Sequence, residues 1–356
     1  MSHVGVVFGG RSVEHQVSVA SARTVARGLR EAGHQVTPLG IAQDGCWLDR
    51  AAAAALLAGE EKAIPPLGVA VAPTLAALLT SGVEVVFPIV HGSWGEDGTL
   101  QGLCEMLDLP YVGPGVTASA VAIDKLFTKH LLAAAGVPVL PCEAVTRADF
   151  ERDPRAFLAR LERLPLPLFV KPRSGGSSVG VKRLDRRECA ETTVRFALQF
   201  DDAVLVERGI AGRELECAVL GYERIEASAV GEIVPGNQFY DYADKYLQDT
   251  ARLLAPADLP PATSERIHAL AVDAFAALGG VGMARVDFLL EGDGSLFVNE
   301  LNTLPGFTAI SMYPRLWELA GVPLPQLTDR LVAIAISRHR DRRRLDEAIK
   351  SWLAEL

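Results

Sequence analysis

A hairpin signature in the last quarter of the chain constrains the fold more than any other stretch. Residues 286–290 and 296–298 are short apolar segments of the kind that form strands. Between them, residues 291–294 read Glu-Gly-Asp-Gly, a combination that favours a tight turn. The sequence therefore predicts two strands joined and paired through this turn.

Three side chains with oxygen atoms lie on this predicted hairpin. Residues two apart in a strand point to the same face, so Glu300 and Asn302 project together, and pairing across the hairpin can bring Asp287 beside them. Two carboxylates and an amide oxygen, without histidine or cysteine nearby, suit Mg²⁺ better than zinc. Arg285 would lie beside such a metal as a clamp for negative charge. Taken alone, the same pattern also fits an exposed hairpin with scattered polar residues.

Length and charge narrow the class of protein. The chain has 356 residues, which is enough for two or three domains that share a cleft and that each bury a core. Its formal net charge of −9 offers no broad basic field for a nucleic acid, so any phosphate must be held locally. We expect a folded protein with no nucleic-acid partner.

Cysteine usage and hydropathy predict the compartment. The five cysteines are odd in number, far apart and without CxxC spacing, which favours neither a zinc site nor a disulfide framework. No apolar run reaches the roughly 18 residues that span a bilayer. Residues 1–10 also lack a basic segment before their short apolar stretch. We therefore expect a cytoplasmic protein that is neither secreted nor embedded in a membrane.

The amino terminus begins with a strand and a glycine-rich turn. Residues 4–8 are apolar, and Gly9-Gly10-Arg11-Ser12 then leads into a helix that we expect to begin near Val17. Such a turn presents backbone N–H groups to a polar ligand, although it is not the GxGxxG pattern of dinucleotide folds. Glu14 lies in this turn, where it would repel a phosphate but would suit an ammonium group.

A second polar loop follows the next predicted strand, residues 84–90. Residues 91–98 read His-Gly-Ser-Trp-Gly-Glu-Asp-Gly, and in an open α/β sheet ligands bind beyond the carboxyl ends of the strands. His91 begins this loop. A lone histidine is more often structural until a partner for it is found.

A third glycine-rich loop follows the predicted strand at residues 168–170. Residues 171–181 begin with a lysine and contain three glycines, three serines and many backbone N–H donors, so they can fold over a triphosphate. A plain hairpin turn is the alternative. The loop lacks the Walker pattern of P-loop proteins.

Two acids flank the start of the last third of the chain. Glu207 follows a predicted strand at residues 203–206, and Glu214 lies seven positions later. Together they can accept hydrogen bonds from an adenine amine and from ribose hydroxyls. Taken singly, each also fits a solvated surface acid.

The stretch at residues 234–261 has no regular periodicity, and a loop of this length in a compact domain is usually a lid or a binding loop. It contains Lys245 and the aromatic residues Phe239, Tyr240, Tyr242 and Tyr246.

Two helical stretches complete the pattern. Residues 122–135 predict one helix with Asp124 and Lys125 in its first turn, ended by Gly136 and Pro138. Residues 338–344 contain five arginines, which we interpret as the solvated face of a closing helix.

Four motifs occur in order along the chain: His91-Gly92 with residues 95–99, Lys171-Pro172 with residues 176–180, Tyr240-Asp241-Tyr242 with Lys245-Tyr246, and residues 299–307. Their order and spacing resemble the ATP-grasp enzymes, specifically the D-alanine:D-alanine ligase family, over nearly the whole chain. The resemblance implies an α/β, three-domain ATP-grasp architecture. It places an amino-terminal α/β substrate domain at 1–115, a central domain at 116–209 and a carboxyl-terminal domain at 210–356, with ATP held between the last two.

The resemblance implies an ATP site made of Lys125, Lys171, Ser178, Glu207, Ile210, Glu214 and Lys245. The lysines would hold the phosphates, Glu207 and the Ile210 backbone would meet adenine, and Glu214 would meet ribose. It also implies that two Mg²⁺, with Mn²⁺ as an alternative ion, bind to Asp287, Glu300 and Asn302 and neutralise the β- and γ-phosphates.

The substrate and catalytic residues implied by the resemblance are Glu14, His91, Ser177, Tyr246, Arg285, Gly306, Ser311 and Met312. Glu14 would pair with the ammonium of a first D-alanine, and Ser177 with Tyr246 would tie the lid over it. That substrate would become an acyl phosphate, which the second amine attacks, with Arg285 and the Gly306 N–H facing the oxyanion. The second carboxylate would meet Ser311 and the Met312 backbone, with His91 near the second amine.

The resemblance thus implies ATP-dependent joining of two D-alanines for a peptidoglycan precursor, with ATP and D-alanine as partners and a homodimer as the assembly. Another ATP-grasp ligase that joins D-alanine to a different acceptor is one alternative, and a non-catalytic nucleotide-binding regulator is another. Gly209 departs from relatives that have a large side chain there to stack on adenine. Ala309 replaces a small polar residue near the acceptor.

Overall fold

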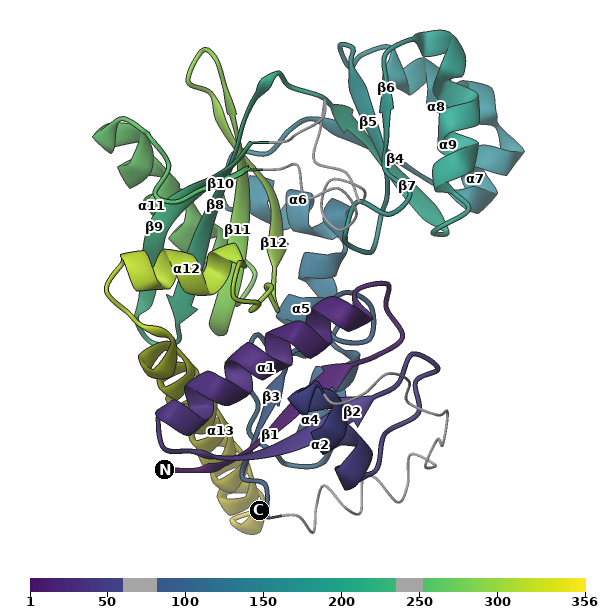
Figure 1. Cartoon of the computed structure of the whole chain (residues 1–356). Helices are drawn as coiled ribbons and strands as arrows, with labels where there is room; N and C mark the ends of the chain where they lie inside the picture. The colour runs from purple at the N-terminus through teal and green to yellow at the C-terminus, as the bar shows by residue number, and fades with distance from the viewer. Residues whose placement is uncertain (60–81, 235–251) are drawn as a thin grey trace.

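The computed structural model describes residues 1–59, 82–234 and 252–356, and these ranges contain three β-sheets with helices around them. Figure 1 shows an amino-terminal lobe below, a four-stranded lobe at the upper right and a five-stranded lobe at the upper left. This arrangement confirms the expected α/β class.

The amino-terminal lobe is built on a parallel three-stranded sheet. Its elements in chain order are β1 (His3–Gly9), α1 (His15–Glu31), β2 (Gln35–Ile41), α2 (Arg50–Ala58), β3 (Val85–Pro88) and α4 (Thr99–Met106). β1 lies in the middle, so Val4 pairs with both Val36 and Val85. Because β1 and β3 are buried along nearly their whole length, their sequences read as continuous apolar runs.

Two helices, α5 (Val116–Ile123) and α6 (Lys125–Ala134), stand where the sequence predicted one helix over residues 122–135. The prediction was wrong at Asp124, whose backbone is extended. Its side chain accepts hydrogen bonds from the backbone N–H groups of Leu126 and Phe127 and so caps the second helix.

The central lobe is an antiparallel four-stranded sheet with helices on one face (Figure 1). Its elements are β4 (Cys142–Thr146), α7 (Arg147–Arg152), α8 (Pro154–Leu161), β5 (Leu168–Pro172), β6 (Lys182–Leu184), η1 (Arg187–Cys189), α9 (Ala190–Ala197) and β7 (Ala203–Arg208). β5 and β6 pair directly, so the glycine-rich loop at residues 173–181 joins two antiparallel strands, as predicted.

The third lobe is an antiparallel five-stranded sheet in the order β10-β9-β8-β11-β12. Its elements are β8 (Gly212–Gly221), β9 (Ile225–Val234), β10 (Arg252–Leu254), α11 (Pro261–Ala277), β11 (Gly282–Glu291) and β12 (Leu296–Asn302). The sequence placed the start of α11 at Ser264, but the helix begins at Pro261, because proline fits a first helical turn where no N–H partner is needed.

Alternation along β8 divides its side chains between two faces of the sheet. Leu215, Cys217 and Val219 pack with α11, whereas Ala218 and Leu220 belong to the core shared with the amino-terminal lobe. Glu214 and Glu216 lie on the same face as this second set. One half of that face is therefore apolar and buried, and the other half is polar.

The carboxyl-terminal helices α12 (Met312–Leu319) and α13 (Leu324–Ala354) return to the amino-terminal lobe. Tyr313 and Trp317 of α12 and Leu331 of α13 are almost fully buried and share one core with Leu29 of α1. No single helix among the described residues is long and apolar enough to cross a membrane; α12 and α13 meet that requirement only as a pair, with a 104° bend between them.

Candidate functional site

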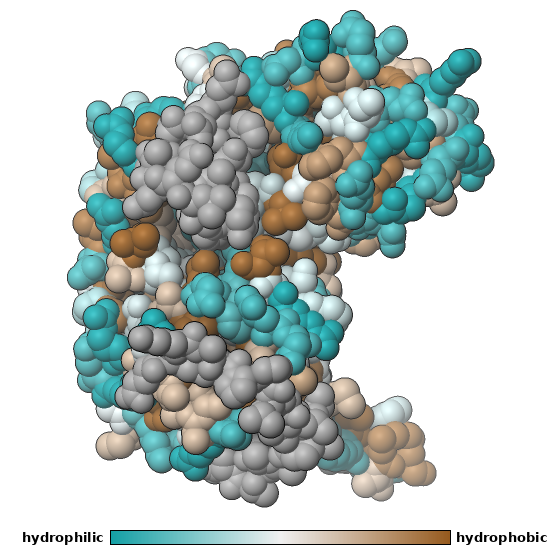
Figure 2. Space-filling view, turned by 45° about the vertical axis from the view of Figure 1, so that its right-hand side comes forward, coloured by the Kyte–Doolittle hydropathy of each residue, from teal (hydrophilic) through white to brown (hydrophobic). Residues whose placement is uncertain are grey.

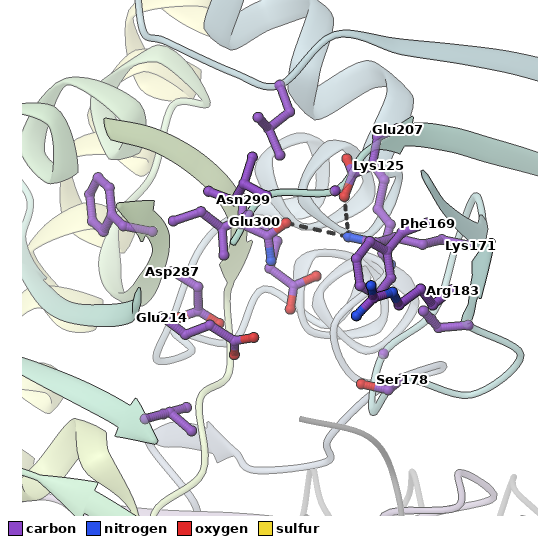
Figure 3. Close-up of a pocket in the computed structure, with 18 of the residues that line it drawn as sticks. Lys125, Phe169, Lys171, Ser178, Arg183, Glu207, Glu214, Asp287, Asn299 and Glu300 are labelled. Carbon is purple, nitrogen blue, oxygen red and sulfur yellow. Dashed lines mark hydrogen bonds and ion pairs between the residues drawn. The ribbon is translucent and has the colours of Figure 1, made fainter. Parts of the chain in front are cut away.

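The central and carboxyl-terminal lobes enclose a cleft of about 580 Å³. The glycine-rich loop, the end of β7, the start of β8 and the β11–β12 hairpin all line it. Figure 3 shows Asp287 and Glu214 on one side of this cleft, with Lys171 and Arg183 on the other. The cleft therefore has an acidic wall that faces a basic wall.

The acidic wall depends on the register of the hairpin. Asp287 pairs with Glu300 and Arg285 pairs with Asn302, which confirms the pairing predicted from the sequence. The register shifts between Asp287 and Phe288, so Asn299 has no direct partner. Without this bulge Glu300 would share the buried face with Val298; with it, Glu300 turns into the cleft beside Asp287.

Arg285 is held between two carboxylates on this wall. Its guanidinium donates two hydrogen bonds of 2.7 Å to Asp287 and lies 3.1 Å from Glu216. Burial acts to lower the pKa of Arg285, but Asp287 and Glu216 outweigh it and raise that pKa well above its usual value. Asn302 donates a further hydrogen bond of 2.9 Å to Asp287. Arg285 thus presents a fixed positive charge, as a bidentate clamp does.

The donor set on this wall suits magnesium. Among the described residues, no group of three or more His, Cys, Asp or Glu side chains is arranged to hold a metal by itself. Mg²⁺ usually takes only one or two protein carboxylates and completes its octahedron with phosphate oxygens and water. The oxygens of Asp287, Glu300 and Asn302 therefore fit a metal that is also bound by a nucleotide.

The basic wall centres on a buried carboxylate shared by two lysines. Glu207 contacts Lys171, and its second oxygen lies 2.8 Å from the Nζ of Lys129. The side chains of Lys129 and Glu207 are only 3% and 2% exposed. Burial acts to raise the pKa of Glu207, but the two ammonium groups outweigh it and lower that pKa to about 2. Lys171 is also 3.4 Å from Asn299 (Figure 3).

Sequence reasoning missed Lys129, although a signal for it was present. Lys129 lies four residues after Lys125 on α6, so both are on the same face of one helix. It also assigned Glu207 to adenine, whereas in this structure the carboxylate is engaged by lysines. Glu216 was missed in the same way, although it lies two residues from Glu214 on one strand and opposite Asp287 in the sheet register.

The glycine-rich loop is tightly curled over the cleft. Ser177 and Ser178 have φ values of 54° and 56°, in the left-handed region that serines rarely adopt. Such backbone conformations are costly and concentrate at ligand clamps. Lys125 secures the base of the loop, since its Nζ donates to the Gly175 carbonyl at 2.6 Å and its backbone N–H donates to the Arg173 carbonyl at 2.9 Å.

The adenine end of the cleft explains the departure at Gly209. A Cβ at Gly209 would lie 2.9 Å from the ring of Phe169 and 3.0 Å from the Pro167 carbonyl, so a large side chain does not fit there. Phe169 lines the cleft near Ile210 and Glu214 (Figure 3). Its aromatic face occupies the place where relatives were expected to supply a side chain from position 209.

Glu14 stands where the amino-terminal lobe meets the glycine-rich loop. A Cβ at Gly92 would lie 3.0 Å from a carboxylate oxygen of Glu14, and one at Gly176 would lie 3.7 Å from it. Glu14 is the first residue before α1 and so is fixed by the start of that helix. The structure thus brings together three loops that are far apart in the sequence.

His91 has two hydrogen-bond partners in this structure. Its Nδ1 lies 2.8 Å from the Leu304 carbonyl, which can only accept, so Nδ1 carries the proton and Nε2 accepts from the Ser21 hydroxyl at 2.9 Å. Burial lowers the pKa of His91, which keeps the ring neutral. Ser21 also accepts from the Phe307 N–H at 3.0 Å, so the histidine fixes the backbone on both sides of Gly306.

Glu96 is a buried acid that sequence reasoning left without a role. It is 9% exposed, and burial together with the charge of Glu14 raises its pKa well above the usual value. Glu96 is therefore protonated near neutral pH and leaves Glu14 as the charged acid at this end.

The acceptor end is formed by the start of α12. The Ser311 hydroxyl accepts from the Thr308 N–H at 2.9 Å and lies 2.8 Å from the position of a Cβ at Gly306, where only glycine fits. Met312 is the first residue of the helix and is 3% exposed. Lys245 and Tyr246 of the predicted lid lie outside the described residues.

Comparison with known proteins identifies relatives along the whole chain. The family model described as D-ala D-ala ligase N-terminus matches residues 3–114, and the model for the C-terminus matches residues 131–333. A D-alanine--D-alanine ligase of Solibacter usitatus is 43% identical over 95% of this chain and 97% of its own.

Two solved structures share the fold. The D-alanine-D-alanine ligase from Coxiella burnetii is 34% identical, covers 99% of both chains and has a TM-score of 0.83. The VanG D-Ala:D-Ser ligase from Enterococcus faecalis is 32% identical, covers 94% of this chain and 99% of its own, and has a TM-score of 0.82.

Proposed function

The chain belongs to the D-alanine–D-alanine ligase family, and we propose from the arrangement of its cleft how it joins its two substrates. The protein ligates two molecules of D-alanine with the use of ATP. We assign the dipeptide product to the synthesis of a peptidoglycan precursor in the cytoplasm, with domains at 1–115, 116–209 and 210–356.

One observation carries this proposal: a single cleft is lined by Lys125, Lys171, Asp287 and Glu300. The lysines supply positive charge for phosphates, and the hairpin supplies oxygen ligands on the facing wall. Phosphoryl transfer relies mainly on positioning and on neutralising charge, which is what such a pair of walls provides.

In the nucleotide site, Phe169 offers its ring to adenine, and Ile210 and Glu214 follow toward the ribose. Lys171 is free to turn from Glu207 to a phosphate, because Lys129 remains to balance the buried carboxylate. The curled backbone at Ser177 and Ser178 directs N–H groups at the phosphate chain.

Asp287, Glu300 and Asn302 would hold magnesium. When bound, the metal neutralises the β- and γ-phosphates. Glu216 holds Arg285 from β8, so that the guanidinium keeps its position when Asp287 turns to a ligand.

In the first step, a carboxylate oxygen of the first D-alanine attacks the γ-phosphorus, and the bond to the β-phosphate oxygen breaks. ADP leaves, and the product is an acyl phosphate. Glu14 pairs with the ammonium group of this substrate, which orients its carboxylate toward the phosphates.

In the second step, the amine of the second D-alanine, after loss of a proton, attacks the acyl carbon. The carbon–oxygen bond to phosphate then breaks, inorganic phosphate leaves, and the peptide bond remains. Arg285 and the Gly306 N–H stabilise the oxyanion that forms. His91 and Ser21 hold the loop that carries Gly306, and Ser311 with the Met312 N–H receives the second carboxylate.

An acceptor panel tests this assignment. Release of ADP and phosphate is measured with ATP and D-alanine, and then with D-serine, D-lactate or L-alanine as the second substrate. We expect release that requires D-alanine and yields D-alanyl-D-alanine. A strong preference for D-serine would support the alternative acceptor, and ATP binding without D-alanine-dependent release would contradict a ligase.

A further inference from the structure

The last turns of α13 carry an apolar stripe. Leu345, Ile349 and Trp352 recur four and three residues apart, a spacing that aligns them on one face of a helix, and Leu353 widens the stripe. Their exposed fractions are 67%, 56%, 59% and 56%. Figure 2 shows the end of α13 projecting at the lower right with hydrophobic side chains on it.

The same face of the helix contacts the amino-terminal lobe just before the stripe. Arg338 lies seven residues before Leu345, donates to the carbonyls of Gly113 and Tyr111 at 2.7 and 3.1 Å, and stacks over the Tyr111 ring at 4.0 Å. Arg342 pairs with Glu105. The sequence assigned these arginines to a solvated face, which is wrong for Arg338. The stripe therefore begins where the body of the protein ends.

Charge is distributed unevenly along this part of the helix. Residues 340–344 contain four arginines against one aspartate, and residues 346–355 contain three acids against one lysine. Because more than half of each stripe side chain is exposed, no other part of the described chain covers the stripe.

We propose that the stripe is a dimer contact and that its occupant is the same stripe of a second copy, in antiparallel orientation. An antiparallel pair places the acidic last turns of one helix beside the arginine-rich turn of the other and opposes their dipoles favourably. A parallel pair would align the two arginine-rich turns. It would also bring the two bodies together, because each body lies on the stripe side of its own helix.

The contact spans only a few helical turns. It is smaller than the roughly 800 Å² per partner of a standard stable interface, so we expect a dimer that dissociates on dilution. The inference is independent of the proposed function, since it concerns a surface remote from the cleft and its readout is molecular mass.

Sedimentation equilibrium of the full chain at increasing micromolar concentrations tests the proposal. The wild type should shift from monomer to dimer. Changing Ile349 and Trp352 together to aspartate should lower the association constant at least tenfold. Ser351→Asp, between them in the sequence but off the stripe, should associate as the wild type does. Thermal melting should be the same for all three proteins, because the stripe lies beyond the cores.

Glu355→Arg tests the orientation. In an antiparallel pair the new positive charge lies near the partner's arginine-rich turn and weakens association. In a parallel pair residue 355 faces itself, and association would not fall. A wild type that stays monomeric, a double variant that still dimerises, or an unchanged Glu355→Arg protein would overturn the proposal. So would a monomer that co-sediments with vesicles containing anionic lipid, since it would assign the stripe to a membrane surface.

Discussion

Lys129 and Glu207 form a buried ion pair 2.8 Å long, in which Lys171 shares the same carboxylate from the cleft side. This relationship makes Lys129 a positioning residue. It balances Glu207 whether or not Lys171 leaves for a phosphate.

We predict that Lys129→Met binds ATP more weakly, because Lys171 is then the only cation left for Glu207. The KM for ATP should rise at least tenfold, with a smaller change in kcat. Stability should also fall, by part of the roughly 3–5 kcal/mol that breaking a buried pair costs. Steady-state kinetics and chemical denaturation check both effects. Lys350→Met, at an exposed lysine of α13, is the control. An unchanged KM would remove Lys129 from the nucleotide site.

Acid should destabilise the protein partly through Glu207. Its pKa of about 2 in the folded chain lies below the value of about 4.3 expected when unfolded, so the unfolded state binds the proton more readily. The stabilisation, on the order of 3 kcal/mol, is present above about pH 4 and is lost as the pH falls toward 2.

The comparison with Glu207→Gln isolates this effect. The difference in unfolding free energy between wild type and variant should be largest near neutral pH and should shrink below about pH 4. Denaturant titrations at several pH values measure it. A difference that stays constant with pH would mean that Glu207 does not titrate in this way.

Glu300→Gln should separate turnover from folding. The change keeps the shape of the side chain and removes a charge that would face the metal, so turnover should fall by orders of magnitude. The melting temperature should change little, because Glu300 lines the cleft and is not part of a core. Turnover at saturating Mg²⁺ is the measurement. Activity like that of the wild type would refute the metal assignment.

Phe169→Leu should weaken ATP binding several-fold, because the ring that fills the space beside Gly209 is lost. The preference among acceptors should not change, since the acceptor end is formed by other elements. Binding of ATP by calorimetry and product analysis check the two parts. Unchanged ATP affinity would show that Phe169 only packs against Gly209.

Local patterns predicted the hairpin because both the turn and the alternation are written within twenty residues of sequence. The bulge was not predictable, since a register shift at Asn299 depends on how β12 pairs with β11 and leaves no mark in residue types. The break between α5 and α6 was readable in hindsight, as Asp124 is a strong capping residue.

Contacts between distant segments could not be predicted from one sequence. Lys129 and Glu207 are 78 residues apart, Ser21 and Phe307 are 286 apart, and nothing local indicates either pair. The resemblance to a known family named Glu14 and Arg285, but it gave no reason for Glu216, Glu96 or Phe169. The roles of Lys245 and Tyr246 stay predictions.

An oxygen-transfer experiment tests the central claim most directly. D-Alanine labelled with ¹⁸O in its carboxyl group is incubated with the enzyme, Mg²⁺ and ATP, and the phosphate released is analysed by mass spectrometry. If the carboxylate attacks the γ-phosphorus and the acyl carbon–oxygen bond then breaks, each phosphate released carries one labelled oxygen from the first D-alanine. Phosphate without label would contradict the acyl-phosphate route and the arrangement of the cleft that we derive from it.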